Sequence, residues 1–84
     1  MASNNGSISI RVVWDNGTPA EGQKVGVTWD GLMSGFESDY TDNDGWVSFN
    51  IFNSSKIQYL TVNDDTVDTD VDIYDGYSAS FTLT

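Results

Sequence analysis

The chain has 84 residues, enough for one small domain. It carries 13 acidic and 3 basic residues, a formal net charge of −10, and it has no His and no Cys. Such a surface repels nucleic-acid phosphates and anionic lipid headgroups, so we expect neither as a partner. The sequence also lacks an apolar run long enough to cross a membrane as a helix, so membrane insertion is not expected.

Residues 1–6 are small and polar, without the charged and apolar parts of a signal peptide. We expect them to form a disordered tail or a cloning remnant, and we expect residues 7–84 to form a single domain. Within that domain, apolar and polar residues alternate in short runs, which is typical of half-buried β-strands. No segment has a helical period.

The first run of alternation covers residues 8–14, and a loop over 17–22 follows it. The next run, 25–29, predicts that Trp29 lies in the core. A third and more polar run over 36–41 predicts a strand near the edge of a sheet. The first half of the domain is therefore expected to contribute three strands.

A tight turn over 42–45, with Asx capping and a glycine that supplies positive φ, leads into a strand over 46–52. The next strand, 56–62, has two possible inward faces, because either its odd-numbered or its even-numbered apolar residues could be buried. A hairpin-type turn at Asp75-Gly76 precedes the last strand, 77–83. Six or seven short strands at this spacing predict an all-β sandwich or barrel.

Two turn motifs carry a resemblance to known domain families. One is Gly17-Thr18-Pro19-Ala20-Glu21-Gly22 before Val25 and Val27, and the other is Thr41-Asp42-Asn43-Asp44-Gly45 before Val47 and Phe49. With the ending, from Tyr59 through Asp75-Gly76 to Phe81-Thr82-Leu83, the chain resembles carboxypeptidase regulatory-like or transthyretin-like (prealbumin-type) domains and bacterial Ig-like surface modules. The resemblance implies an all-β, Greek-key β-sandwich of about seven short strands, transthyretin-like or Ig-like.

The resemblance also bears on function. Family members that hydrolyse hydroxyisourate use His residues, which this chain lacks, and modules with a Lys–Asn isopeptide crosslink carry Lys on the first strand, where this chain has only Arg11. The implied role is a non-catalytic structural or adhesion module of a larger secreted or cell-surface protein, with neighbouring domains or another protein as partner. The polar segment Phe36–Thr41 is a further candidate for recognition, as an edge to which a partner strand could add.

Trp46 is the first candidate for ligand binding. It is out of phase with Val47 and Phe49, so it either is exposed or covers an end of the sandwich. An exposed Trp beside polar side chains can stack on a sugar ring, and Tyr40 and Asn50 are close to it in the sequence. The alternative function is therefore a carbohydrate-binding module in which Trp46, Tyr40 and Asn50 contact a polysaccharide.

Three carboxylates alternate in the segment 67–73. Asp68, Asp70 and Asp72 are predicted on one strand face, about 6.5–7 Å apart, opposite the apolar residues of the segment. Because like charges at this spacing repel one another, the face is either well solvated or bridged by a cation, and Ca²⁺ suits a cluster of carboxylate oxygens. We expect no cofactor, with Ca²⁺ at these three residues as the open alternative.

Overall fold

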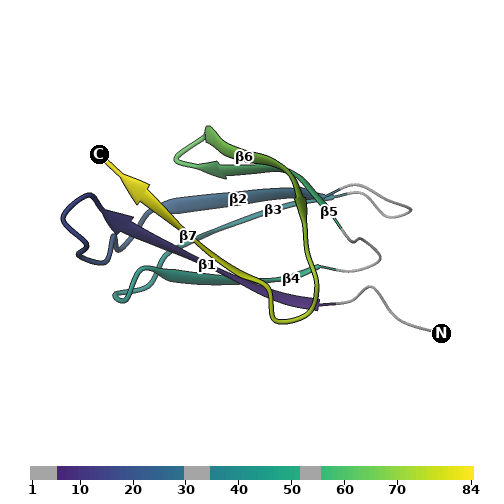
Figure 1. Cartoon of the computed structure of the whole chain (residues 1–84), viewed down its shortest axis with the longest axis horizontal. Coiled ribbons are helices and arrows are strands. Elements are labelled where there is room, and N and C mark those ends of the chain that lie inside the picture. The colour runs from purple at the N-terminus through teal and green to yellow at the C-terminus, as the bar shows by residue number, and fades with distance from the viewer. Residues whose placement is uncertain (1–5, 30–34, 52–55) are drawn as a thin grey trace.

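The computed structural model of the chain describes residues 6–29, 35–51 and 56–84 (Figure 1). These residues form seven strands and no helix, so the predicted all-β fold is confirmed, and none of them belongs to a membrane-spanning helix. The strands are β1 (Gly6–Trp14), β2 (Lys24–Trp29), β3 (Gly35–Tyr40), β4 (Trp46–Ile51), β5 (Lys56–Val62), β6 (Asp65–Asp72) and β7 (Ser78–Leu83). β1 includes Gly6, the last residue of the predicted tail, whose residues 1–5 lie outside the described part.

The strands form two sheets that pack as the predicted sandwich. One sheet has the order β4-β1-β7 and the other has the order β3-β2-β5-β6. β1 pairs antiparallel with β4 but parallel with β7, whereas every pairing in the second sheet is antiparallel. The predicted polar strand, β3, lies at an edge of its sheet. In Figure 1, β1 starts at one end of the long axis and β7 finishes at the other end.

The core lies between the inner faces of the two sheets. In β1 the alternation places Ile8, Ile10 and Val12 on the inner face, where none is more than 1% exposed. The other buried apolar side chains are those of Ala20, Val25, Val27, Val47, Phe49, Ile57, Leu60, Val62, Val71 and Ile73. Trp29, predicted to lie in the core, is only partly buried and packs against this cluster. Each fully buried Val, Leu or Ile contributes about 1.5–3 kcal/mol by its removal from water.

A β-bulge decides which face of β5 is buried. Ile57 and Leu60 are three residues apart, so in a regular strand they would point to opposite faces. The register against β2 shifts in this region, and Gln58 has no partner residue in β2. The extra residue returns Ile57 to the inner face that Leu60 occupies. Tyr59, by contrast, points outward and is 46% exposed.

The predicted Asx-capped turn at Asp42–Gly45 is confirmed. The Asp42 Oδ1 atom accepts hydrogen bonds from the backbone N–H groups of Asp44 (2.8 Å) and Trp46 (3.0 Å). Gly45 has a φ of 83°, and a Cβ atom there would lie 2.5 Å from the Val12 carbonyl oxygen, so only glycine fits. The turn carries the chain from β3 in one sheet to β4 in the other.

The predicted turn at Asp75-Gly76 is present, closed by a hydrogen bond from the Tyr77 N–H to the Tyr74 carbonyl at 2.9 Å, but it does not connect a hairpin, because β6 and β7 lie in different sheets. The turn instead docks on the start of β1. The Ser7 N–H donates to an Asp75 carboxylate oxygen at 3.0 Å, and the Gly76 N–H donates to the Ser7 carbonyl at 2.9 Å. A two-residue hairpin occurs at Asn63-Asp64, between β5 and β6, where both residues have the positive φ (52° and 70°) that a type I′ turn requires.

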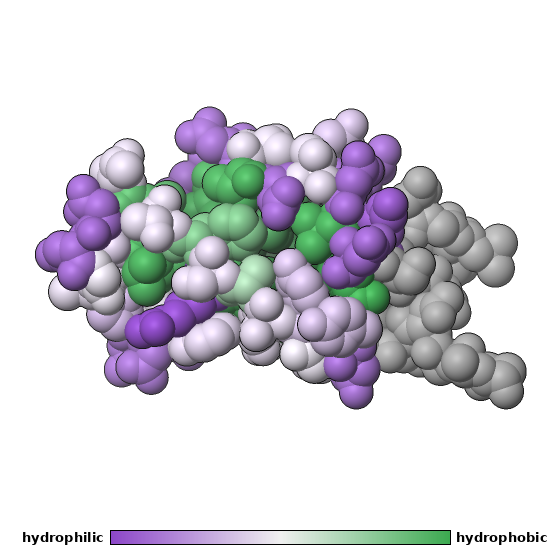
Figure 2. All heavy atoms as spheres, in the orientation of Figure 1, coloured by the Kyte–Doolittle hydropathy of each residue, from purple (hydrophilic) through white to green (hydrophobic). Residues whose placement is uncertain are grey.

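The sandwich is open along the side of β7. β7 and β6 are edge strands of different sheets, and no backbone pairing joins them. The inward residues of β7, namely Ala79, Phe81 and Leu83, are only partly buried against the core. Figure 2 shows apolar residues in a broken band along this face, flanked by polar ones. Partly uncovered apolar surface therefore continues from this side toward the end of the molecule where β1 and β7 finish.

Candidate functional site

Trp46 lies at the start of β4, on the outer face of the three-stranded sheet. Its neighbour Val47 is 5% exposed and faces the core, whereas Trp46 itself is 37% exposed. Its register partner in β1 is Arg11. The guanidinium carbon of Arg11 lies 5.8 Å from the ring centroid of Trp46, within the range of a cation–π contact. The ring is therefore partly exposed, which is one of its two predicted placements, but Arg11 occupies one of its faces.

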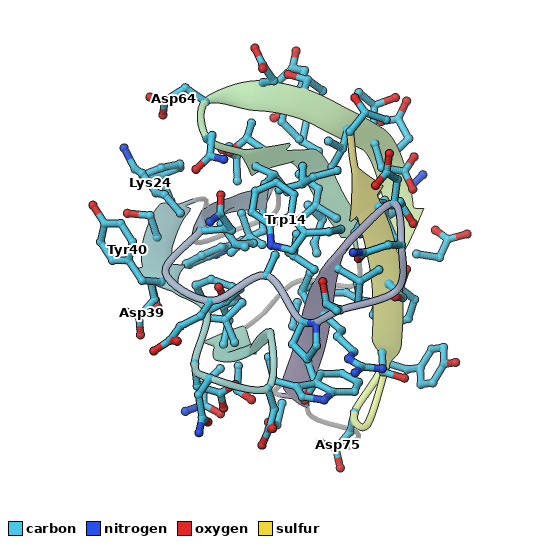
Figure 3. The ribbon with its side chains drawn as sticks, turned by 90° about the vertical axis from the view of Figure 1, so that its left-hand side faces the viewer. Trp14, Lys24, Asp39, Tyr40, Asp64 and Asp75 are labelled. Atoms are coloured by element: carbon cyan, nitrogen blue, oxygen red, sulfur yellow. The ribbon has the colours of Figure 1, made fainter. Side chains whose placement is uncertain are left out.

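Tyr40 and Trp46 project from opposite sides of the sandwich. Tyr40 follows Asp39, whose register partner is the buried Val25, so Tyr40 lies on the outer face of the four-stranded sheet (Figure 3). Asn50 shares the outer face of β4 with Trp46, but it lies four residues further along the strand, about 13 Å away. All three residues predicted to bind a sugar are at the surface. They do not come together as one site.

The register of β6 separates the three carboxylates that the sequence predicts on one face. Asp68 pairs with the buried Leu60 and lies on the inner side. Asp72 pairs with Lys56 on the outer side, where its carboxylate is 3.7 Å from the Lys56 Nζ atom. Between them, Asp70 has a φ of 53° and no register partner in β5, which breaks the alternation. The predicted common face is therefore wrong, and within the described ranges no group of three or more His, Cys, Asp or Glu side chains is placed to hold a metal ion.

The edge strand β3 carries charges on its core-facing side. Glu37 and Asp39 pair with the buried residues Val27 and Val25, so both carboxylates lie on the inner face of the sheet. Inward-pointing charges at an edge strand disfavour pairing with another chain, because such pairing would bury them. The segment Phe36–Thr41 is thus at an edge, as expected, but its side chains oppose the addition of a partner strand.

A cleft of about 350 Å³ opens at the end of the sandwich where β1 and β7 finish. Figure 3 looks at this end of the molecule, with Trp14 near its centre, between the two sheets. The side chain of Trp14 is 38% exposed. The apolar lining residues are Trp14, Val62, Val67 and Leu83, and the polar ones are Gln23, Asn63, Asp65, Thr82 and Thr84.

Trp14 and Asp65 face this cleft from opposite sheets. Trp14 ends the inward-facing series of β1, and Asp65 pairs with Val62, which is 2% exposed on the inner face of the other sheet. The turn after β1 fixes the backbone of Trp14. The Trp14 N–H donates to the Thr18 carbonyl, and the Gly17 N–H donates to the Trp14 carbonyl, both at 2.8 Å. These two bonds fix the backbone from which the indole ring projects into the cleft.

The amide groups at the rim of the cleft already have partners within the protein. Asn63 donates from Nδ2 to the Gln23 Oε1 atom at 2.9 Å and accepts at Oδ1 from the Lys24 N–H at 3.1 Å. The Asp65 carboxylate makes no hydrogen bond or ion pair with any residue that the structure describes. Asp65 is thus the polar group of the cleft with the most unused bonding capacity.

The chain matches no known protein-family model and none of the curated proteins compared with it. The function of the cleft is therefore inferred from the residues that line it.

Trp14 was not among the site residues predicted from the sequence. It is in phase with Ile10 and Val12, and a residue in that position is expected to face the core. One local signal marks its position: the turn residues Asp15-Asn16-Gly17 follow directly. An inward aromatic side chain on the last residue of a strand lies at the end of a sandwich, where the core stops.

Proposed function

We propose that this protein is a non-catalytic structural module that spaces or presents neighbouring parts of a longer secreted or cell-surface protein. The observation that carries the proposal is the parallel pairing of the first and last strands, from Ser9–Ser78 to Trp14–Leu83. Because β1 and β7 run in the same direction, the chain enters the sandwich at one end and leaves it at the other (Figure 1). Segments on either side would be held in line, separated by the length of β1, about 26 Å.

The same pairing suits the module to bear tension. A force between the two ends of the chain pulls β1 and β7 in opposite directions along their ladder. The hydrogen bonds between the strands are then loaded in shear and have to break together. β1 is also held on its other side by β4, because it is the central strand of its sheet.

The charge distribution supports a place outside the cell. The chain has 13 acidic residues and only 3 basic ones, so its surface keeps a large excess of negative charge. The self-repulsion of such a surface is weakest where salt screens it, as in many extracellular media. The absence of Cys means that the fold does not depend on the redox state of its compartment.

Single-molecule force spectroscopy on one protein pulled in two directions tests the proposal. The chain has no Cys, so introduced cysteines provide defined attachment points. Handles at the two termini load β1 and β7 in shear, whereas handles on Asp15→Cys and Thr84→Cys peel the strands apart from one end. At the same loading rate, we expect the terminal pull to require a several-fold higher unfolding force. Equal forces in the two geometries, at matched stability in urea, would contradict a load-bearing role.

A further inference from the structure

We propose that the end cleft binds an organic cation, in the form of a basic side chain of a protein partner, between Trp14 and Asp65. The inference goes beyond the structural role proposed above and does not depend on it. It rests on three features of the cleft: its charge, its aromatic surface, and the hydrogen bonds that already occupy the amide groups at its rim.

The side chains that line the cleft in the described structure carry a net negative charge. Among the described residues that line it, Asp65 is acidic and none is Lys or Arg. Lys24 follows the lining residue Gln23 in the chain, but its Nζ atom is held by Asp64 at 3.2 Å, away from Trp14 (Figure 3). The net charge of −10 raises the local concentration of cations around the whole protein. An anionic ligand would be repelled, and a cationic one meets an unpaired carboxylate.

Trp14 supplies an aromatic surface that no cation of the described chain occupies. Indole is the strongest cation–π partner among the aromatic side chains. Trp46 shows this contact within the protein, because its ring lies beside Arg11. Trp14 has no such neighbour, and the apolar walls beside it, Val62 and Leu83, suit the methylene stem of a long basic side chain.

The two amide side chains at the rim favour a cation over a neutral sugar. A sugar ring presents hydroxyl groups that need both donors and acceptors around them. The side chains of Gln23 and Asn63 are bonded to each other, and Gln23 also donates to the Glu21 carbonyl at 2.9 Å. An ammonium or guanidinium group needs only acceptors. Asp65 supplies acceptors without breaking any contact within the described protein.

An NMR titration with Nα-acetyl-lysine methylamide tests the proposal, and Nα-acetyl-norleucine methylamide is the matched compound without the charge. The chain has 3 Trp residues, whose indole N–H signals report on separate places. We expect the lysine compound to shift the Trp14 signal saturably at millimolar concentration, and to leave the Trp46 signal unchanged. The norleucine compound should have little effect, and added NaCl should weaken the binding by screening.

Two variants of the cleft have matched controls in the same chain. Trp14→Leu and Asp65→Asn should each weaken binding about two- to fivefold, the range for a cation–π contact or ion pair at an exposed site. Trp46→Leu and Asp64→Asn remove the same ring and the same charge outside the cleft, and they should change the affinity less than about twofold. If Trp14→Leu fails to fold, Trp14→Tyr, a weaker cation–π partner, replaces it.

Three results would overturn the proposal. Equal weakening by Asp65→Asn and Asp64→Asn would mean that the lysine compound is attracted by the acidic surface in general and not by the cleft. A neutral oligosaccharide that shifts the Trp14 signal, with no response to the lysine compound, would make the cleft a sugar site. No shift of the Trp14 signal by any of these compounds would mean that the cleft does not bind a basic side chain.

Discussion

The fold perturbs the ionisation of Tyr77. Its ring is partly buried against the core and meets Tyr74 edge to face, with ring centroids 5.6 Å apart. Burial, followed by the negative charge of Asp68 and the neighbouring Tyr74, raises the pKa of Tyr77 above its ordinary value of 10.0. Each cause disfavours the charged phenolate. The influence of Asp68 also agrees with its position on the inner side of β6.

We expect alkaline pH to destabilise the protein through Tyr77. Because the folded-state pKa lies above the unfolded-state value of about 10, the contribution of neutral Tyr77 is complete below pH 10 and is lost as pH rises through the folded-state pKa. Tyr77→Phe should flatten this loss, and Asp68→Asn, which removes one cause, should reduce it in part. Melting temperatures from neutral pH to about pH 11 measure the effect. A Tyr77→Phe protein with the alkaline profile of the wild type would refute this account.

Among the strands, β6 departs most from its predicted geometry. Asp70 has a φ of 53°, in the left-handed region that Asp tolerates better than most residues but that a β-branched side chain avoids. Asp72, two residues later, pairs regularly with Lys56. The two aspartates are both exposed, so their backbone conformations distinguish them rather than their burial.

Asp70→Val and Asp72→Val should therefore have different effects on the free energy of unfolding. At position 70 the β-branched side chain meets a left-handed backbone, and we expect a loss of about 1–2 kcal/mol. At position 72 the gain in strand propensity offsets the loss of an exposed ion pair, and the change should stay within about 0.5 kcal/mol. Urea unfolding of the two variants compares them directly. Equal losses would show that the kink in β6 is absent in solution.

For the protein as a whole, the net charge of −10 is the main electrostatic term. Repulsion among the carboxylates destabilises the folded state, and salt screens it, so we expect the melting temperature to rise with NaCl. CaCl₂ and MgCl₂ at equal concentration should raise it equally, because the register of β6 disperses the carboxylates that a specific Ca²⁺ site would need. Thermal melts monitored by circular dichroism measure both effects. A larger rise in CaCl₂ than in MgCl₂ would reveal a calcium site.

The candidate sites were predictable only in part. The sequence placed Trp46 out of phase with the core, and its ring is indeed partly exposed. It did not indicate that Arg11 would cover that ring, since the contact depends on the register between β1 and β4. Trp14 is in phase with the inward residues of β1, but alternation tells which side a residue faces and not whether anything covers it. The cleft that Trp14 shares with Asp65 therefore went unpredicted.

Features that depend on a few consecutive residues were predictable from the sequence. They are the alternation that makes β1 amphipathic, the Asx-capped turn at Asp42–Gly45, and the all-β character with about seven strands. Features that depend on distant partners were not predictable. The bulge in β5, the kink at Asp70 and the sheet change at Asp75-Gly76 arise because each strand settles against its neighbours to fill one shared core. Only the tertiary structure decided that β1 and β7 pair in parallel and that Trp14 and Asp65 line one cleft. Strands far apart in the chain pair in the way that best packs the whole core, and a local sequence pattern does not carry that information.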